Sequence, residues 1–314
     1  MLDWLRSLFA RLFGRGRPLA PGLVESFRPG PTPSPPAGML QLMSVNGTFP
    51  QQGPGPAQFT IGMVESFAGS FGAYGMPGCT GQMLSIAQYQ PLTAVIGMNF
   101  GGDGTQHIEL PNLHGRVIIG GAPVGRMTQN ALGMTWLIAT SEGSGAPAPG
   151  MVAAFGGIAA PGGWAVCDGT MLAIGPNVGL FEAIGNAFGG DGEADFMLPD
   201  LNGAAPVGVG PTMARGQKVS GTIDGLGLYY LINATGQLPP ATGNGAPPAT
   251  GGYAGQVIAF AGAAPPAGWL VCDGSLLQAS AWPTLFIAIG NQWGGDGKTS
   301  FALPDLRGKM LPGR

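Results

Sequence analysis

One sequence pattern occurs three times in this 314-residue chain, at spacings that do not vary. Each copy has a phenylalanine 12 residues before a cysteine, a Gly-Gly-Asp-Gly turn beginning 22 residues after it, and a leucine nine residues after the turn begins. The anchors are Phe67, Cys79, Gly101 and Leu110; Phe155, Cys167, Gly189 and Leu198; and Phe260, Cys272, Gly294 and Leu303. Compositional bias does not produce offsets without insertions or deletions, so the chain contains one small fold three times.

Each unit has the local pattern of a strand, a turn-rich loop, a short helix and a closing segment. Segments such as MVAAFGG (151–157) predict a short strand, and PGGWAVCDG (161–169) predicts turns around a buried aromatic residue. The stretch GLFEAIGNAFGGDG (179–192) places Leu, Phe and Ile at helical spacing, before glycines that can end a helix. We therefore predict an α+β fold, mainly β, with one short helix per unit and Gly/Pro-rich loops. Because roughly 60 residues give little core, neighbouring units are expected to pack together.

The composition excludes several classes of protein. The 59 glycines and 30 prolines recur at fixed offsets, which favours punctuated β-structure over disorder. A net charge of -3 gives no basic surface for nucleic acid. The three cysteines lie one to a unit, so no disulfide within a unit is possible and they are expected to be small buried hydrophobic residues. No apolar run is long enough for a membrane-spanning helix.

Motifs of the second unit, GWAVCDG (163–169), LFEAIGNAFGGDG (180–192) and FMLPDLNG (196–203), have counterparts at the same spacing in the third. Together they closely resemble the phage tail-collar domain, which is also found in the microcystin-dependent-protein family. In the first unit Met76, Thr80 and Asn112 stand where the others have Trp, Asp and Asp, so that unit is degenerate. The positions that carry the structural signature are Trp164, Cys167, Asp168, Trp269, Cys272, Asp273, Asp103, Asp191, Asp296, Pro111, Pro199 and Pro304.

The repeats divide the chain into eight segments. These are an amphipathic N-terminal helix (1–20), a Pro/Gly-rich spacer (21–37), a lone strand with its linker (38–61), the degenerate collar unit 1 (62–127), a strand and linker (128–150), collar unit 2 (151–211), a strand with a Pro/Gly/Ala linker (212–255), and collar unit 3 (256–314). In the N-terminal segment, residues 1–17 place apolar residues on one face and arginines on the other, which suits docking on a membrane surface or a partner protein. Arg6 and Arg11 interrupt its apolar run, so no Sec signal peptide is recognised.

Collar unit 3 is followed by no apolar strand, whereas units 1 and 2 are followed by ALGMTWLIAT (131–140) and GLGLYYLINATG (225–236). A similar strand precedes unit 1, and its apolar residues Leu40, Leu42, Met43 and Val45 make it a candidate donor strand within residues 38–50. A strand of matching pattern can cover an unpaired sheet edge. Donation to unit 3 of the same chain closes a pseudo-threefold ring, whereas donation to the next chain builds an open fibre. The third alternative is that residues 38–50 are an ordinary linker.

The chain has few groups that could perform catalysis or bind a metal ion. His107 and His114 lie in the degenerate unit, where Asp103 or Glu109 are the nearest additional metal ligands in the sequence, and a loop position is favoured for both. One aspartate per Gly-Gly-Asp-Gly turn supplies too few oxygen ligands for calcium, which binds about six to eight, and Asp-Gly is a common turn pair. The cysteines of units 2 and 3 have no histidine in their units to act as a base, so catalysis by these thiols is not expected. For Trp164 and Trp269, a position in the core is favoured over a role in stacking against sugars. We therefore expect no enzyme activity, cofactor or bound metal.

The resemblance implies a structural protein of a phage-type tail fibre, located in the virion tail or outside the cell, whose main partner is itself. The leading expectation is self-assembly into a fibre or a fibre-collar element by head-to-tail strand donation. The alternative is an adhesin-like protein, built as a closed pseudo-threefold monomer, in which linkers such as residues 239–255 recognise a cell-surface receptor or glycan.

Overall fold

The computed structural model describes residues 38–44, 60–69, 76–121, 123–140, 147–235 and 252–313. The expected N-terminal helix (1–20), the spacer (21–37), Val45 and residues 239–251 of the Pro/Gly/Ala linker lie outside the described residues. Within the described part the fold is mainly β, as predicted, with three short α-helices and one 3₁₀ turn.

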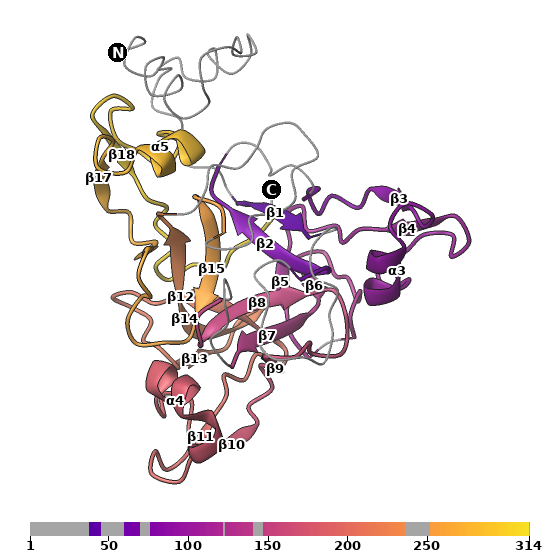
Figure 1. Cartoon of the computed structure of the whole chain (residues 1–314), viewed down its shortest axis with the longest axis horizontal. Helices are drawn as coiled ribbons and strands as arrows, with labels where there is room; N and C mark the ends of the chain where they lie inside the picture. The colour runs from indigo at the N-terminus through magenta and orange to yellow at the C-terminus, as the bar shows by residue number, and fades with distance from the viewer. Residues whose placement is uncertain are drawn as a thin grey trace.

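Each of the three units projects a lobe from a central sheet, and the lobes point in three directions (Figure 1). A lobe consists of a seven-residue helix and a two-stranded antiparallel ladder. The lobe elements are α3 (Gln90–Ile96) with β3 (Met83–Ser85) and β4 (His107–Glu109); α4 (Val178–Ile184) with β10 (Met171–Ala173), β11 (Asp195–Met197) and the 3₁₀ turn η1 (Gly175–Asn177); and α5 (Pro283–Ile289) with β17 (Leu276–Gln278) and β18 (Ser300–Ala302). Each helix ends at a glycine with positive φ, namely Gly97, Gly185 and Gly290, as the sequence predicts.

The three strands that open the units meet at the centre, where each pairs with both of the others. These strands are β2 (Met63–Phe67), β8 (Met151–Phe155) and β15 (Gln256–Phe260). The first residues of β2 pair with the last of β8, the first of β8 with the last of β15, and the first of β15 with the last of β2. This cyclic pairing gives the centre of the molecule a pseudo-threefold axis.

A second set of three strands flanks this centre, at one common register. Strand β1 (Leu40–Met43) pairs antiparallel with β2, β7 (Thr135–Ala139) with β8, and the C-terminal half of β14 (Asp224–Asn233) with β15. Gln41, Trp136 and Tyr230 therefore occupy equivalent positions, opposite Ser66, Ala154 and Ala259. β7 and β14 also pair with β9 (Trp164–Val166) and β16 (Trp269–Val271), while Leu42 of β1 makes the corresponding bridge to Gly78.

The remaining strands attach units 1 and 2 to the segments that follow them. β5 (Val117–Ile119) pairs parallel with β6 (Ala131–Gly133), and β12 (Ala204–Gly208) pairs parallel with the N-terminal half of β14, beside the short β13 (Lys218–Val219). The apolar strands between units thus serve two neighbours, because their first part completes the preceding unit and their second part pairs with the opening strand of the next.

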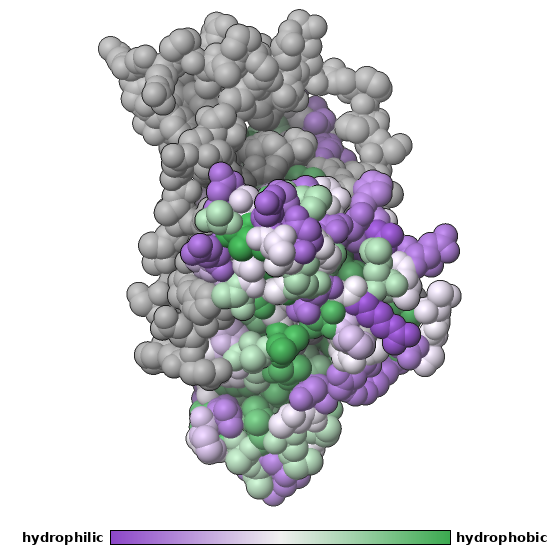
Figure 2. Space-filling model, turned by 90° about the vertical axis from the view of Figure 1, so that its right-hand side faces the viewer, coloured by the Kyte–Doolittle hydropathy of each residue, from purple (hydrophilic) through white to green (hydrophobic). Residues whose placement is uncertain are grey.

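The core is shared between units rather than confined to each one. One buried cluster combines Leu180 and Phe196 of unit 2 and Leu226 of β14 with Phe301 of unit 3 and with Met39, which directly precedes β1. In the side view of Figure 2, hydrophilic residues gather on the upper and right-hand projecting parts, and the most hydrophobic residues show in the recess below them. No helix within the described ranges is long and apolar enough to cross a membrane.

Candidate functional site

The same pair of backbone hydrogen bonds joins the units at all three junctions. Gly120 donates its N–H to the carbonyl of Ala204 and accepts from Gly203, at 3.2 and 2.7 Å. Gly208 makes the corresponding bonds to Lys309 and Gly308, at 3.0 and 2.7 Å. Gly313 makes them to Arg116 and Gly115, at 3.0 and 2.9 Å. Units 1, 2 and 3 are therefore connected in a cycle, and unit 3 closes onto unit 1.

Each junction requires a glycine for lack of space rather than for its backbone conformation. A Cβ on Gly120 would lie 2.6 Å from the carbonyl oxygen of Leu201, and one on Gly208 would lie 1.9 Å from that of Leu306. On Gly313 it would lie 2.4 Å from the carbonyl oxygen of Leu113. These glycines stand 41 residues after the cysteine of their unit, so the repeat spacing could have revealed them, although the motif comparison did not single them out.

The N-terminal strand completes the cycle at the junction of units 3 and 1. Met39 donates its N–H to the carbonyl of Pro312 at 3.1 Å and forms a parallel bridge with Gly313. Met134 makes the equivalent bond to Ile119, at 3.0 Å. Met39, Leu42 and Met43 are buried, with at most 3% of their surface exposed, so the interpretation of residues 38–50 as an ordinary linker is wrong for the described residues 38–44.

One part of the donor-strand expectation needs correction. The antiparallel partner of Leu40–Met43 is β2 of unit 1, not a strand of unit 3, and β15 of unit 3 already has β14 in this role. Among the described residues, Met39 makes the backbone hydrogen bond and the bridge that join the N-terminal segment to unit 3. From its place after a unit, each apolar strand is expected to end that unit, whereas most of its pairing is with the unit that follows.

The signature cysteines connect each outer strand to the closing segment of a unit. Cys79, Cys167 and Cys272 donate their N–H groups to Gln41, Trp136 and Tyr230, at 2.7 to 2.9 Å. Their carbonyls accept from Leu113, Leu201 and Leu306, at 2.8 to 2.9 Å. All three thiols are free and buried, and burial raises the pKa of each well above its ordinary value. A neutral buried thiol is a poor nucleophile, so these residues are placed for structure.

The signature aspartates fall into two sets, both of which organise turns. Asp103, Asp191 and Asp296 each accept three backbone N–H groups of the following residues through one carboxylate oxygen. Side-chain hydrogen bonds from His107 and Thr299, for the first and third, together with these backbone bonds lower the pKa of all three carboxyls. Asp168 and Asp273 accept from the N–H and hydroxyl of the residue two positions on. In the degenerate unit, Thr80 instead hydrogen-bonds to Gln82.

The signature prolines accept backbone hydrogen bonds, and the signature tryptophans are buried or half-buried. The carbonyls of Pro111, Pro199 and Pro304 accept from the glycine after each signature aspartate or Thr80, at 3.2 to 3.3 Å. Trp164 is buried and Trp269 half-buried, and Met76 is buried in the degenerate unit. His107 pairs with Asp103 at 2.8 Å, while His114 is exposed. Among the described residues, no three His, Cys, Asp or Glu side chains lie close enough together to hold a metal ion.

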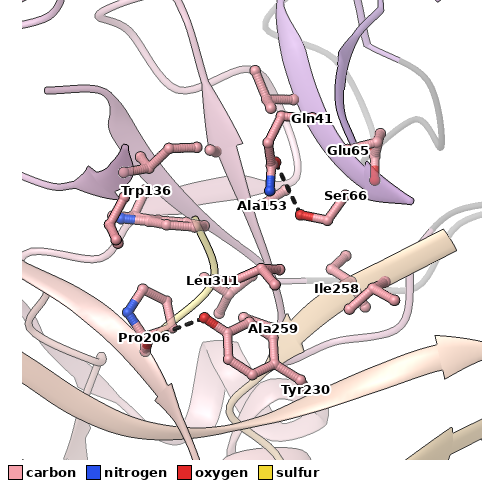
Figure 3. Close-up of a pocket in the computed structure, with 16 residues that line it drawn as sticks. Gln41, Glu65, Ser66, Trp136, Ala153, Pro206, Tyr230, Ile258, Ala259 and Leu311 are labelled. Atoms are coloured by element: carbon pink, nitrogen blue, oxygen red, sulfur yellow. Dashed lines mark hydrogen bonds between the residues drawn. The ribbon is translucent and has the colours of Figure 1, made fainter. Parts of the chain in front are cut away.

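A cavity of about 30 Å³ lies on the pseudo-threefold axis, lined by equivalent residues of all three units. Figure 3 shows Gln41, Trp136 and Tyr230 around it, with the Ser66 hydroxyl donating to Gln41 at 3.0 Å and the Tyr230 hydroxyl donating to Pro206 at 2.9 Å. The volume suffices for one or two water molecules. This lining mixes amide, indole and phenol groups at one symmetric position, so no repeated motif points to the cavity.

The fold and its junctions define a class: a mainly β structural module in which three repeats surround a pseudo-threefold axis. The family model for the phage tail collar domain matches residues 62–118, 150–206 and 255–311, which together are more than half of the chain. The protein therefore belongs to the phage tail collar domain family. Neither the curated proteins nor the solved structures contain a match to it.

Proposed function

We propose that this protein is a structural, non-catalytic component of a phage-type tail fibre, in which one chain forms a closed three-unit collar. The observation that carries the proposal is the threefold repetition of one backbone exchange, at Gly120, Gly208 and Gly313. A ring of this kind gives a fibre a pseudo-threefold element without requiring three chains to meet. The family assignment supports a place in the virion tail.

Self-assembly of the chain into a fibre would use the same junction contacts between neighbouring chains instead of within one chain. Units 1 and 2, and units 2 and 3, are joined by linkers, but the junction of unit 3 with unit 1 has no covalent connection. If that junction forms between chains, as in a domain swap, the molecules add head to tail into a filament. The closed ring satisfies the junction at no cost in association entropy, and we therefore place it ahead of the filament.

Light scattering and negative-stain microscopy distinguish the two arrangements. The full-length chain is compared with a deletion of residues 38–50 and with a control deletion of residues 1–37, which keeps β1. The closed ring predicts the mass of one chain at all concentrations for the full-length protein and the control, and destabilisation or aggregation without β1. Filaments that lengthen with concentration and disappear with the 38–50 deletion would contradict the closed ring and support head-to-tail donation.

A second candidate function, recognition of a cell-surface glycan, is favoured by one cleft. It has a volume of about 470 Å³ and lies between residues 128–131, where β6 begins, and residues 221–224, where β14 begins. Thr128, Gln129, Asn130, Thr222 and Asp224 supply hydroxyl, amide and carboxylate groups of the kind that hydrogen-bond sugars. A glycan array with the full-length protein tests this candidate, with Asn130→Ala as the variant; no bound glycan, or binding unchanged in the variant, would exclude this cleft.

The absence of enzyme activity is also a proposal. It is supported by the roles of the nucleophilic and acidic side chains. The thiols are buried and neutral, and the carboxylates of five signature aspartates accept hydrogen bonds from backbone N–H groups in their own turns. Release of sugars from host polysaccharide by the purified protein would contradict it.

A further inference from the structure

The ring-closing junction contains a buried polar pair. Glu65 of β2 and Gln256 of β15 are 6% and 2% exposed, and the Gln256 amide Nε2 donates to Glu65 Oε2 at 2.6 Å. These residues are 191 positions apart in the chain and lie on opposite sides of the one junction that no linker spans.

The two equivalent pairs elsewhere in the ring are apolar. Because the three central strands share one register, Gln256 and Glu65 correspond to Met63 and Ala153 where β2 meets β8, and to Met151 and Ile258 where β8 meets β15. All four of these residues are buried in one hydrophobic cluster. The polar pair thus marks the junction of unit 3 with unit 1, since Gln256 placed beside either apolar strand would have no partner there.

The neighbouring strands supply no positive charge to compensate Glu65. Strands β1, β8 and β15, which pack against β2, contain no ionisable side chain. Tyr230, which lines the axial cavity together with Glu65, and Tyr253, which precedes β15, stay neutral because burial raises the pKa of each phenol. Burial likewise raises the pKa of the Glu65 carboxyl to about 7, against an opposing effect of the Gln256 hydrogen bond.

The neutral acid fits the geometry of the pair better than the carboxylate does. Within the described part of the chain, Gln256 Oε1 is buried and accepts no hydrogen bond. A protonated Glu65 can donate its O–H to this oxygen while its other oxygen accepts from Nε2, so that acid and amide form two hydrogen bonds. Ionisation removes the donor and leaves a buried charge beside an unsatisfied carbonyl oxygen.

We infer that Glu65 and Gln256 form a proton-dependent clasp on the ring-closing junction, which is tight when Glu65 is neutral and loosened when it is ionised. The clasp rests on the closed ring of the proposed function. In an open junction Glu65 faces water and titrates at the ordinary glutamate pKa of 4.5, whereas in the closed ring it titrates near 7. Between pH 4.5 and pH 7 the closed ring therefore binds one more proton than the open ring, at Glu65. Closure is strongest below pH 4.5, and the contribution of neutral Glu65 to closure is lost as the pH rises to 7.

The test is hydrogen exchange of the full-length protein at pH 5 and pH 8, corrected for the intrinsic exchange rate. The β7–β9 ladder, away from this junction, is the internal control. We expect the protection of residues 63–67 and 256–260 to fall by roughly fifty- to a hundredfold relative to the control, as the two pKa values imply. In Glu65→Gln, which stays neutral, this pH dependence should disappear. The double variant Glu65→Ala/Gln256→Met copies the Met63–Ala153 pair and should be well protected at both pH values.

Two outcomes would overturn the clasp: protection independent of pH in the natural sequence, or the same pH dependence in Glu65→Gln. Light scattering on the same samples separates this failure from failure of the closed ring. A single-chain mass with pH-independent protection contradicts the clasp alone, whereas polymer at both pH values in all variants contradicts the ring on which it rests.

Discussion

Substitution of Gly208 by alanine probes the junction of units 2 and 3 most directly. The added Cβ would lie 1.9 Å from the carbonyl oxygen of Leu306 and 2.7 Å from its carbon, and these are backbone atoms that cannot rotate away. To relieve the overlap β12 must move away from residues 306–309, which breaks the hydrogen bonds of Gly208 with Lys309 and Gly308. At about 1 kcal/mol for each bond, with the lost packing added, we expect a destabilisation of about 2–3 kcal/mol.

Thermal unfolding followed by scanning calorimetry measures this effect, and at roughly 2–4 °C per kcal/mol the midpoint should fall by about 5–10 °C. Gly179→Ala is the matched control, because nothing lies within 4 Å of its added Cβ, and alanine in helix α4 should be neutral or stabilising. Gly120→Ala should be milder than Gly208→Ala, since its nearest backbone oxygen lies at 2.6 Å. A midpoint for Gly208→Ala equal to that of the Gly179 control would refute the close-packed junction.

Three further predictions concern the buried thiols, one tyrosine and one turn aspartate. The three cysteines should resist a thiol reagent at pH 8 in the native protein and react together only in urea, because they are buried with raised pKa values; rapid native labelling would place one at the surface. Tyr230→Phe should cost about 1–2 kcal/mol in urea unfolding, since the buried bond to the Pro206 carbonyl is lost, and an unchanged midpoint would show that this bond does not stabilise the fold. Asp296→Asn should lower the urea midpoint at pH 7. The pKa of Asp296 is lowered in the folded state, so its contribution is present above the ordinary value of 3.8 and is lost as the pH falls further; a variant effect that is the same at pH 7 and pH 2 would contradict this origin.

Local features of the sequence predicted the lobes well. Helix α4 ends at Gly185 and helix α5 at Gly290, as the glycine pattern indicated, and the aspartates of the Gly-Gly-Asp-Gly turns cap their own loops. These features depend on interactions between residues within about five positions of each other, so a short sequence motif contains all the residues involved. The pairing of Gln256 with Glu65 and the axial cavity could not be predicted in this way, because they join residues that are far apart and chemically different in each unit.

The repeat spacing and the local residue patterns are enough to show that one fold occurs three times, where its turns and helices fall, and that an apolar strand precedes the first unit. Which partner this strand takes depends on contacts between residues that are far apart in the chain. A strand has two edges, and its apolar pattern is the same whichever edge is paired, so the pattern alone does not distinguish the preceding unit from the following one. Leu40–Met43 pair with β2 of unit 1, and Met39 hydrogen-bonds to Pro312 of unit 3. The strand therefore contacts both units and closes the ring.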